Sequence, residues 1–530
     1  MSEPTATSAP PEPMSRRETL EALSGLLLVL FVSMLNVTIV SVALPQIVGS
    51  LNGTQAQYTW VVTAALLAGT ATTPIWGKLA DLFSKKLLIQ ISIGLFIIGS
   101  LACGFAQNTG QLIGFRVIAG LGMGALQVLV QVVIAAMIPP KERGRYNGYL
   151  GAVMAVATVG GPLLGGLIAD TSWLGWRWCF FIAVPFCIAA FVLLSKTLHL
   201  ADVRKDDVKI DYLGATLIAA GVSLLLIWVT FVDNEFAWIS WQTGAMVGGT
   251  LVLLGLAVWV ESRVPMPVVP LRIISRRVPA LSILSSLAVG MAMFGGSVFL
   301  GQYFQIGRGY SPTEAGLLTV PMMAGVLISS TISGRMISKS GAVKSYIITG
   351  LIVLTLGFAA LSRLDHETPL WFVMVAMACV GVGVGLSMQN LMLVLQNTVP
   401  LQDLGAASGA LTFFRSLGGT IGVSVLGAIL ANQVAADIAA GLAKLGIKTA
   451  GANTGGTLNL EALPEPIKLI VRAAYGDATG HIFLVSVGIA LVGLVAALFL
   501  PRVRLRETID LAPEEGGKPS AVAASRADTK

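Results

Sequence analysis

The segment Gly77-Lys-Leu-Ala-Asp81-Leu-Phe-Ser84-Lys85-Lys86 has a counterpart in Gly334-Arg-Met-Ile-Ser-Lys-Ser-Gly-Ala-Val-Lys344, which begins 257 positions later. Each segment leaves a long apolar run through a glycine and enters a short basic turn. The same offset relates Gly161-Pro162-Leu-Leu-Gly165-Gly166 to Gly418-Gly419-Thr-Ile-Gly422. The shared offset indicates an internal repeat, and the even number of apolar runs between the copies makes them point the same way. Parallel repeats are one transporter architecture, with the binding site between the halves.

The composition of the chain fits a protein that lies in lipid. Of its 530 residues, 55% are hydrophobic and 12% are charged, and the mean hydropathy is +0.82. A soluble protein carries about 25% charged residues. These values exclude a soluble globular enzyme, a disordered chain and a secreted disulfide scaffold. The net charge of +7 comes from scattered basic residues that form no continuous groove for nucleic acid.

Apolar runs of about 20 residues, long enough to span a bilayer, recur along the chain. Their basic connections alternate in a way that places most of the 34 Lys and Arg residues on the same side as both termini, which predicts that both termini are cytoplasmic. The fourteen predicted spans are 22–46, 57–80, 87–106, 111–138, 146–169, 179–197, 211–231, 241–260, 280–304, 313–336, 345–362, 370–396, 406–431 and 478–500.

Several motifs in these spans resemble those of the major facilitator superfamily, specifically its fourteen-span drug:proton antiporter branch. They are the first-helix run Met34–Pro45, the loop Gly77–Lys86, Arg116 with Gly120, Gly122 and Gly124, and the fifth-helix run Gly161–Gly166. The resemblance implies an all-α integral membrane protein of two six-helix bundles plus two inserted helices. It also implies a transporter that works by alternating access, and the fifth-helix motif implies export.

The resemblance and the spans together define the expected organisation. We expect a disordered cytoplasmic N-terminus over 1–19, an N-terminal bundle over 20–200, two inserted helices over 201–275, a C-terminal bundle over 276–505 and a disordered cytoplasmic tail over 506–530. The C-terminal bundle includes an outside loop over 432–476, where a short amphipathic helix would fit.

Two groups of residues are candidates for conformational control. By resemblance, Asp81 latches the bundles together on the cytoplasmic face, within the loop that also carries Gly77, Lys85 and Lys86. The alternative is a local ion pair that only fixes topology, since surface pairs contribute about 0–1 kcal/mol. In the fifth span, Gly161, Pro162, Gly165 and Gly166 predict a bend or a close helix contact.

The candidate substrate cavity is built around two arginines that lie inside predicted spans, Arg116 and Arg415. Such a residue faces a water-filled cavity or a polar partner. Gln127 and Gln131 lie 11 and 15 residues after Arg116, so the three form one stripe on a helix. Hydrogen bonding inside the first bundle is the alternative. The other candidates are Gln302, Tyr303, Gln305, Gln389, Asn390 and Phe414.

Asn36 departs from the branch pattern, which has an aspartate at this point of the first helix as a candidate proton carrier. Asparagine does not titrate, and no carboxylate lies near a predicted midplane. Two deep arginines without deep acids favour neutral or anionic amphiphiles over cationic drugs.

These observations predict a secondary active exporter of drug-like or lipid-like amphiphiles in the cell membrane. It would act as a monomer without cofactor or metal, and a proton gradient would be its energy source. An uncoupled facilitator or an uptake symporter of neutral or anionic solutes is the alternative. An enzyme is disfavoured because the sequence has no HExxH helix and no phosphate-binding loop, which also speaks against a nucleotide partner. A receptor without transport activity stays open.

Overall fold

The computed structural model describes residues 16–51, 55–170, 175–200, 211–232, 236–264, 267–269, 271–310, 312–444, 464–503 and 505–506. In these ranges the regular structure is helical, apart from one isolated bridge between Val232 and Phe236. The elements are α1 (Arg16–Ser50), α2 (Gln55–Leu82), α3 (Lys85–Gly104), α4 (Thr109–Met137), α5 (Pro140–Asp170), α6 (Trp178–Phe181), α7 (Ala183–Thr197), α8 (Tyr212–Phe231), α9 (Trp241–Glu261), α10 (Leu271–Ile274), α11 (Arg277–Gln302), η1 (Tyr303–Gly307), α12 (Pro312–Leu318), α13 (Val320–Ser340), α14 (Val343–Leu361), α15 (Leu370–Thr398), η2 (Leu401–Asp403), α16 (Leu404–Lys444) and α17 (Glu465–Leu498).

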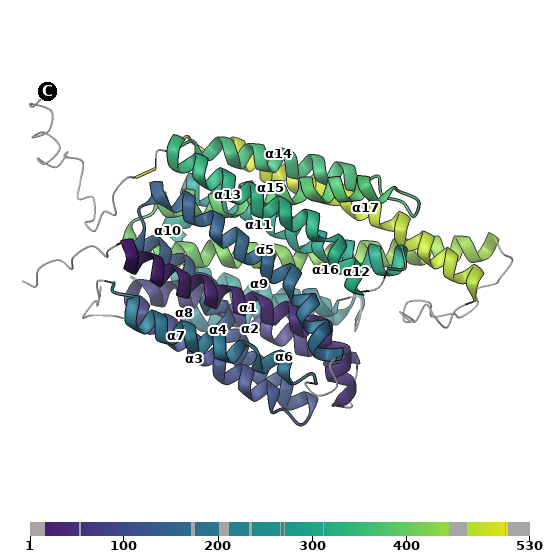
Figure 1. The fold of residues 1–530 in the computed structure, drawn as a ribbon, viewed down its shortest axis with the longest axis horizontal. Coiled ribbons are helices and arrows are strands. Elements are labelled where there is room, and N and C mark those ends of the chain that lie inside the picture. The colour runs from purple at the N-terminus through teal and green to yellow at the C-terminus, as the bar shows by residue number, and fades with distance from the viewer. Residues whose placement is uncertain are drawn as a thin grey trace, which may run out of the picture.

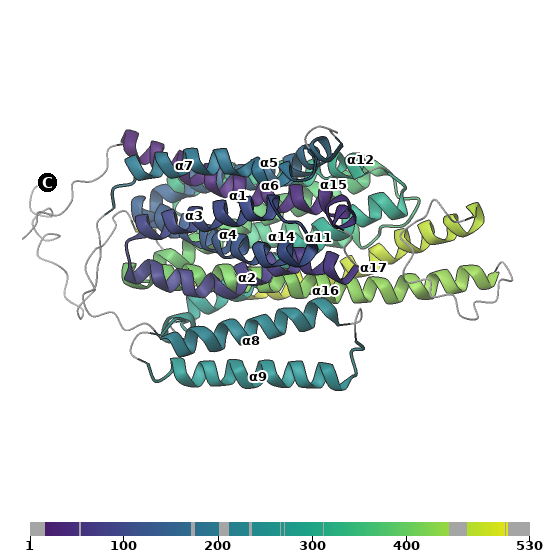
Figure 2. The same ribbon diagram turned by 90° about the horizontal axis from the view of Figure 1, so that it is seen from below.

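The long helices run side by side in one elongated bundle (Figures 1 and 2). Among the described residues, eleven helical segments are long and apolar enough to cross a membrane. The further helices α2, α5 and α11 lie parallel among them. The predicted all-helical membrane fold is therefore confirmed.

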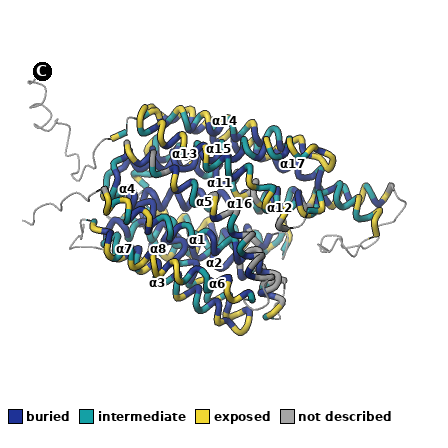
Figure 3. The backbone as a smooth tube through the Cα atoms, in the orientation of Figure 1, coloured by how far each residue is buried: buried dark blue, intermediate teal, exposed yellow. Residues whose placement is uncertain are grey.

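The buried core divides between the two halves of the sequence. One cluster of buried side chains is built almost wholly from α11 to α17, and two others are built almost wholly from α1 to α7. Dark blue buried segments in Figure 3 lie where helices face one another, and exposed segments lie on the periphery. The central helix α4 has 78% of its apolar window buried, whereas the outer helix α9 has 17%.

The helices α8 and α9 form a hairpin beside the two halves, as a separate layer below α2 and α16 in Figure 2. The hairpin packs on the two halves mainly through α8, whose buried residues Ile218, Val222 and Leu226 belong to a cluster with Ala71 of α2 and Phe413 of α16.

Two predicted spans are interrupted at a proline. The sixth is divided into α6 and α7, which meet at Ile182, and the tenth into α12 and α13, which meet at Thr319. Pro185 and Pro321 lie just after these breaks. Proline has no backbone N–H to donate to the carbonyl oxygen of the residue four positions earlier, and its ring clashes with that carbonyl group.

Two expectations about the ends of helices were wrong. Residues 16–19 are helical rather than disordered, in a first turn where Arg17 pairs with Glu21 at 2.8 Å. The stretch 432–476 is helical at both ends, because α16 continues to Lys444 and α17 begins at Glu465, and the two project beyond the other helices in Figure 1. Apolar residues with helical spacing, Val434, Ile438 and Leu442, are buried in this projection. The rest of the loop, and most of the two termini, lie outside the described residues.

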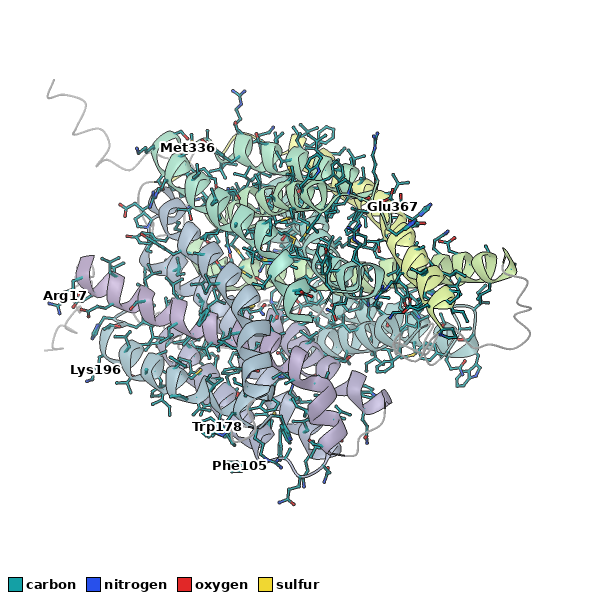
Figure 4. All side chains as sticks on the ribbon, turned by 45° about the vertical axis from the view of Figure 1, so that its right-hand side comes forward. Arg17, Phe105, Trp178, Lys196, Met336 and Glu367 are labelled. Atoms are coloured by element: carbon teal, nitrogen blue, oxygen red, sulfur yellow. The ribbon has the colours of Figure 1, made fainter. Side chains whose placement is uncertain are left out.

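We name the two ends of the bundle by their charge. The end at which α1 begins and α7 ends carries Arg17 and Lys196 and is called the basic end, while Glu367 lies toward the opposite, far end (Figure 4). Since the helices alternate in direction, α2, α9 and α13 end at the basic end, and α3, α5, α14 and α16 begin there.

Candidate functional site

The first contact between the halves joins α2 to α16 at the basic end, through glycine backbones. A Cβ atom added to Gly77 would lie 2.5 Å from the carbonyl oxygen of Gly405 and 3.0 Å from Cα of Gly409. No side chain separates these helices, so their backbones approach as closely as glycine allows.

Asp81 holds this contact from one turn further along α2. Its carboxylate accepts hydrogen bonds from the backbone N–H groups of Gly405 (2.7 Å) and Ala406 (2.8 Å), in the first turn of α16. These donors have no partner inside their own helix, and the N-terminus of a helix favours negative charge. The predicted latch residue therefore bridges the two halves.

The second contact joins α5 to α13 in an equivalent way. Gly334 packs against Gly144, where an added Cβ would overlap the carbonyl oxygen, and a Cβ on Gly148 would lie 2.8 Å from Cα of Thr331. Because Gly77 and Gly334 are repeat partners, the α2–α16 and α5–α13 contacts are two copies of one arrangement. We call the pair of contacts the gate.

The lysines in the loops of the two repeat copies make contacts within their own half, not between the halves. Lys86 donates to the carbonyl oxygen of Ser195 (2.6 Å) at the end of α7, and Lys344 donates to that of Leu498 (2.9 Å) at the end of α17. Each lysine thus caps the C-terminus of its bundle's last helix. Lys85 is close enough to Asp81 to interact with it electrostatically.

The fifth-helix glycines face α1 within the N-terminal half. A Cβ on Gly165 would lie 2.9 Å from the carbonyl oxygen of Ile39, and Gly161 packs directly on Thr38. The hydroxyl of Thr38 in turn donates to the carbonyl oxygen of Ala157 (3.2 Å). The surroundings of Pro162 and Gly166 lie outside the described residues.

Arg116 lies inside the N-terminal half, two turns from the far end of α4. Its guanidinium donates to the carbonyl oxygen of Val61 (3.1 Å) and, at 3.4 Å, to Oδ1 of Asn36. Both Arg116 and Asn36 are buried, and the Nδ2 atom of Asn36 has no hydrogen-bond partner among the described residues. The bonds that Arg116 makes match the alternative of interhelical bonding, and they tie α4 to α1 and α2.

Gln131 and Gln389 meet between the halves. The Nε2 atom of Gln131 lies 3.4 Å from Oε1 of Gln389, and the Nε2 atom of Gln389 lies 4.0 Å from the sulfur of Met154. The two glutamines lie on α4 of one half and α15 of the other and are 258 positions apart, one more than the offset of the glycine motifs. On the same helices, Gln127 is half-buried, and the buried Asn390 donates to its own helix at Leu386 (2.7 Å).

Arg415 is a residue of α16 and packs against α11 in the C-terminal half. It is buried, its backbone packs against Gly290, and its Nη1 atom has no hydrogen-bond partner among the described residues. Phe414 is half-buried and contacts Phe413 edge-on at 5.1 Å between ring centroids. A buried polar atom without a partner is rare and needs an explanation, such as water or a ligand.

Three candidates at the end of α11 lie away from the glutamine pair, toward the far end. Tyr303 is fully buried in the C-terminal core, and its hydroxyl donates to the carbonyl oxygen of Asp365 (3.0 Å) in the loop between α14 and α15. Gln302 is half-buried and Gln305 is exposed. A π-helical turn, η1, begins at Tyr303 and re-aims the side chains that follow it, which is not visible in the apolar periodicity.

The same loop contains a pH-sensitive contact between His366 and Asp477 of α17. The ring Nδ1 of His366 lies 3.0 Å from Oδ1 of Asp477, and this hydrogen bond raises the pKa of the imidazole above its ordinary value of about 6.5. Because the pKa of His366 is higher in the folded than in the unfolded protein, the contact stabilises the fold at pH values below the ordinary pKa. This stabilisation is lost as the pH rises through the raised pKa.

We therefore expect His366→Gln to lower the thermal midpoint at pH 5.5 by about 1 °C, since the pair is half-exposed, and to have no effect at pH 8. In an Asp477→Asn background the substitution should change nothing at either pH. A decrease of equal size at both values would contradict this assignment.

Sequence reasoning missed Arg143, which it used only as a sign of orientation. This buried arginine of α5 donates to the carbonyl oxygen of Ile138 (2.6 Å) at the end of α4 and lies 3.5 Å from Oε1 of Gln396 on α15. Gln396 also contacts Ser408 of α16 at 3.1 Å. The cluster joins both halves beside the gate, and the signal for it was an arginine in the first turn of a helix, three residues after Pro140.

Buried carboxylates are confined to the basic end in the part of the chain that the structure describes. They are Asp81 near the end of α2, Asp211 before α8 and Glu261 at the end of α9. Elsewhere along the bundle, the buried polar groups of the described residues are hydroxyl, amide and guanidinium groups, such as those of Ser387, Gln389 and Arg415.

Comparisons with known proteins agree with this arrangement. The profile of the Major Facilitator Superfamily matches residues 26–423. The multidrug transporter protein MdtP of Bacillus subtilis (strain 168) is 35% identical over 408 residues, covering 77% of this chain and 74% of MdtP. The efflux pump dotC of Dothistroma septosporum is 32% identical over 499 residues, covering 92% of this chain and 84% of the pump.

A solved structure of the proton:xylose symporter XylE has the same fold, with a TM-score of 0.60 at 13% identity, covering 92% of this chain and 96% of that one. The two repeated helical halves, the gate between them and the match over 26–423 show that the chain is a transporter of the major facilitator superfamily.

Proposed function

We propose that the protein is a secondary active exporter of amphiphilic small molecules, drug-like or lipid-like, that works by alternating access in the cell membrane. It belongs in this proposal to the fourteen-span drug:proton antiporter branch, acts as a monomer, and uses a proton gradient. The basic end and both termini face the cytoplasm, in keeping with the positive-inside rule.

The observation that carries the proposal is the bond from Asp81 to the first turn of α16. It joins the two halves at one end of the bundle through a charge and two backbone donors. Water can replace both partners when the halves separate, so the contact can open and close. The gate around it consists of glycine backbones without interlocked side chains, which also permits separation.

The direction of transport is inferred from relatives. MdtP is named a multidrug transporter and dotC an efflux pump, and each aligns with most of this chain. The glycines of the fifth helix, which pack on α1 here, support the same direction by resemblance.

We propose neutral or anionic amphiphiles as the cargo. Arg415 is buried, and its Nη1 atom has no partner among the described residues. The buried acids of the same part of the chain are all at the basic end. A permanent cation would find no counter-charge midway along the bundle, whereas an anion could pair with Arg415.

The test is transport by the purified protein in liposomes with an imposed pH gradient, with anionic, neutral and dicationic amphiphiles offered in parallel. We expect gradient-dependent transport of an anionic amphiphile and a decrease of about tenfold or more in Arg415→Gln, because a charge-assisted bond contributes about 1.5–3 kcal/mol. Arg335→Gln is the control, since Arg335 is exposed on α13. Strong transport of dications with little transport of anions would overturn the cargo proposal.

An uncoupled facilitator is the second candidate, favoured by Asn36 standing where an acid would carry a proton. In that case counterflow would proceed at the same rate without the pH gradient, and Asn36→Asp would introduce a dependence on it. An uptake symporter would instead accumulate cargo when the gradient is reversed.

A further inference from the structure

A recess of about 860 Å³ opens at the basic end of the C-terminal half, away from the gate. It lies between the turn that joins α13 to α14 and the segment that follows α17. Gly341, with φ of 68°, forms the turn and begins one wall. The recess belongs neither to the gate nor to the candidate cavity.

The polar side of the recess is cationic. Lys339, Lys344 and Arg502 line it, together with serines of the α13–α14 turn, and no carboxylate does among the described residues. Lys344 is held by the carbonyl oxygen of Leu498 at 2.9 Å. Lys339 and Arg502 are exposed and form no ion pair or side-chain hydrogen bond within the described chain. Two cations are therefore free to bind an anion.

The rest of the lining of the recess is apolar apart from backbone groups. Val343, Ile348 and Leu505 line it. Beside it, the outer faces of α14 and α17 expose large apolar side chains, including Leu356 at 63% and Leu498 at 52%. In Figure 1, α14 lies along the upper edge of the bundle, where no other helix covers it.

From this arrangement we infer that the recess binds the phosphate headgroup of an anionic phospholipid, whose acyl chains lie along α14 and α17. A cationic pocket at the level where a helix leaves the membrane suits such headgroups. The first turn of α14 also lines the recess, and the positive end of its dipole adds to the attraction. A free phosphate ion shares the headgroup chemistry but would leave the apolar wall unused.

The test is lipid retention by the full-length protein in detergent, measured by native mass spectrometry after incubation with phosphatidylglycerol or phosphatidylcholine. We expect the protein to retain phosphatidylglycerol in preference to phosphatidylcholine. The double variant Lys339→Gln/Arg502→Gln should retain at least about tenfold less phosphatidylglycerol than the unmodified protein. Retention of phosphatidylcholine should not change. Lys344 is left intact because it caps α17.

Lys196→Gln is the matched control, because Lys196 is an exposed cation at the same end of the other half. It should retain phosphatidylglycerol as the unmodified protein does, and all variants should keep the same thermal midpoint. Equal retention by the double variant and the control would overturn the inference. Binding of millimolar inorganic phosphate that depends on Lys339 and Arg502, with no dependence of lipid retention on them, would assign the recess to a free anion instead and overturn the lipid site.

Discussion

Replacing Gly334 by leucine is expected to abolish transport by preventing closure of the gate. A Cβ at this position overlaps the carbonyl oxygen of Gly144 and lies 2.8 Å from its carbonyl carbon, and leucine adds three more carbons. Overpacking costs about 1–3 kcal/mol where neighbours can shift. Here the neighbour is backbone, which cannot shift easily, so we expect a cost at the upper end of that range. The population of the closed state should then decrease by about a hundredfold.

Gly94→Leu is the matched control for this substitution. Gly94 also lies within a long helix, α3, but a Cβ there meets nothing within 4 Å, so transport should be retained. Both variants should be compared by size-exclusion profile and thermal midpoint before transport is measured. A folded Gly334→Leu protein that transports like the control would show that α5 and α13 need not meet at this point.

Replacing Asp81 by asparagine is expected to shift the protein toward a state that is open at the basic end. Asparagine has one acceptor oxygen and no charge, so one of the bonds to Gly405 and Ala406 is lost and the other is weakened. Hydrogen bonds to a charged group contribute about 1.5–3 kcal/mol, which corresponds to an increase of about ten- to a hundredfold in the open population.

The open population can be measured from distances between spin labels at Lys196 and Lys339, which lie near the basic ends of α7 and α13 in opposite halves. We expect a longer distance to gain population in Asp81→Asn. Ser338→Ala is the control, because Ser338 is the repeat partner of Asp81 and its hydroxyl donates, within the described residues, to its own helix at Gly334 (3.0 Å). An unchanged distribution in Asp81→Asn would mean that the carboxylate does not hold the gate.

The fold could be predicted because its main determinants are local or periodic. Apolar runs of membrane length, and glycine motifs recurring at one offset, are sufficient to indicate two similar helical halves. The errors occurred where the pattern alone does not fix the ends of a helix. Glycines and polar residues interrupt the run 432–476, yet Val434, Ile438 and Leu442 on one helical face are enough to extend α16.

The candidate site could be predicted only as a set of residue types. Asp81 was identified from its motif, but its partners are backbone N–H groups more than 300 positions away, and every residue other than proline has such a group. The contact between Gln131 and Gln389 depends on how α4 and α15 face each other, which the sequence pattern does not fix. Gln305 could not be placed, since it lies within the π-turn that begins at Tyr303.

A reversible cross-link across the gate tests most directly whether transport requires the two halves to separate at the basic end. A Cβ on Gly148 would lie 3.3 Å from Cβ of Thr331, close to the spacing of about 3.5–4.5 Å in disulfides. The four native cysteines are first replaced by alanine. In this background the reduced Gly148→Cys/Thr331→Cys protein should transport more slowly than the parent, because the added Cβ lies 2.8 Å from Cα of residue 331. This remaining transport should be lost on oxidation and regained on reduction, while neither single variant responds to oxidation. Full transport by the oxidised, cross-linked protein would contradict alternating access through this gate.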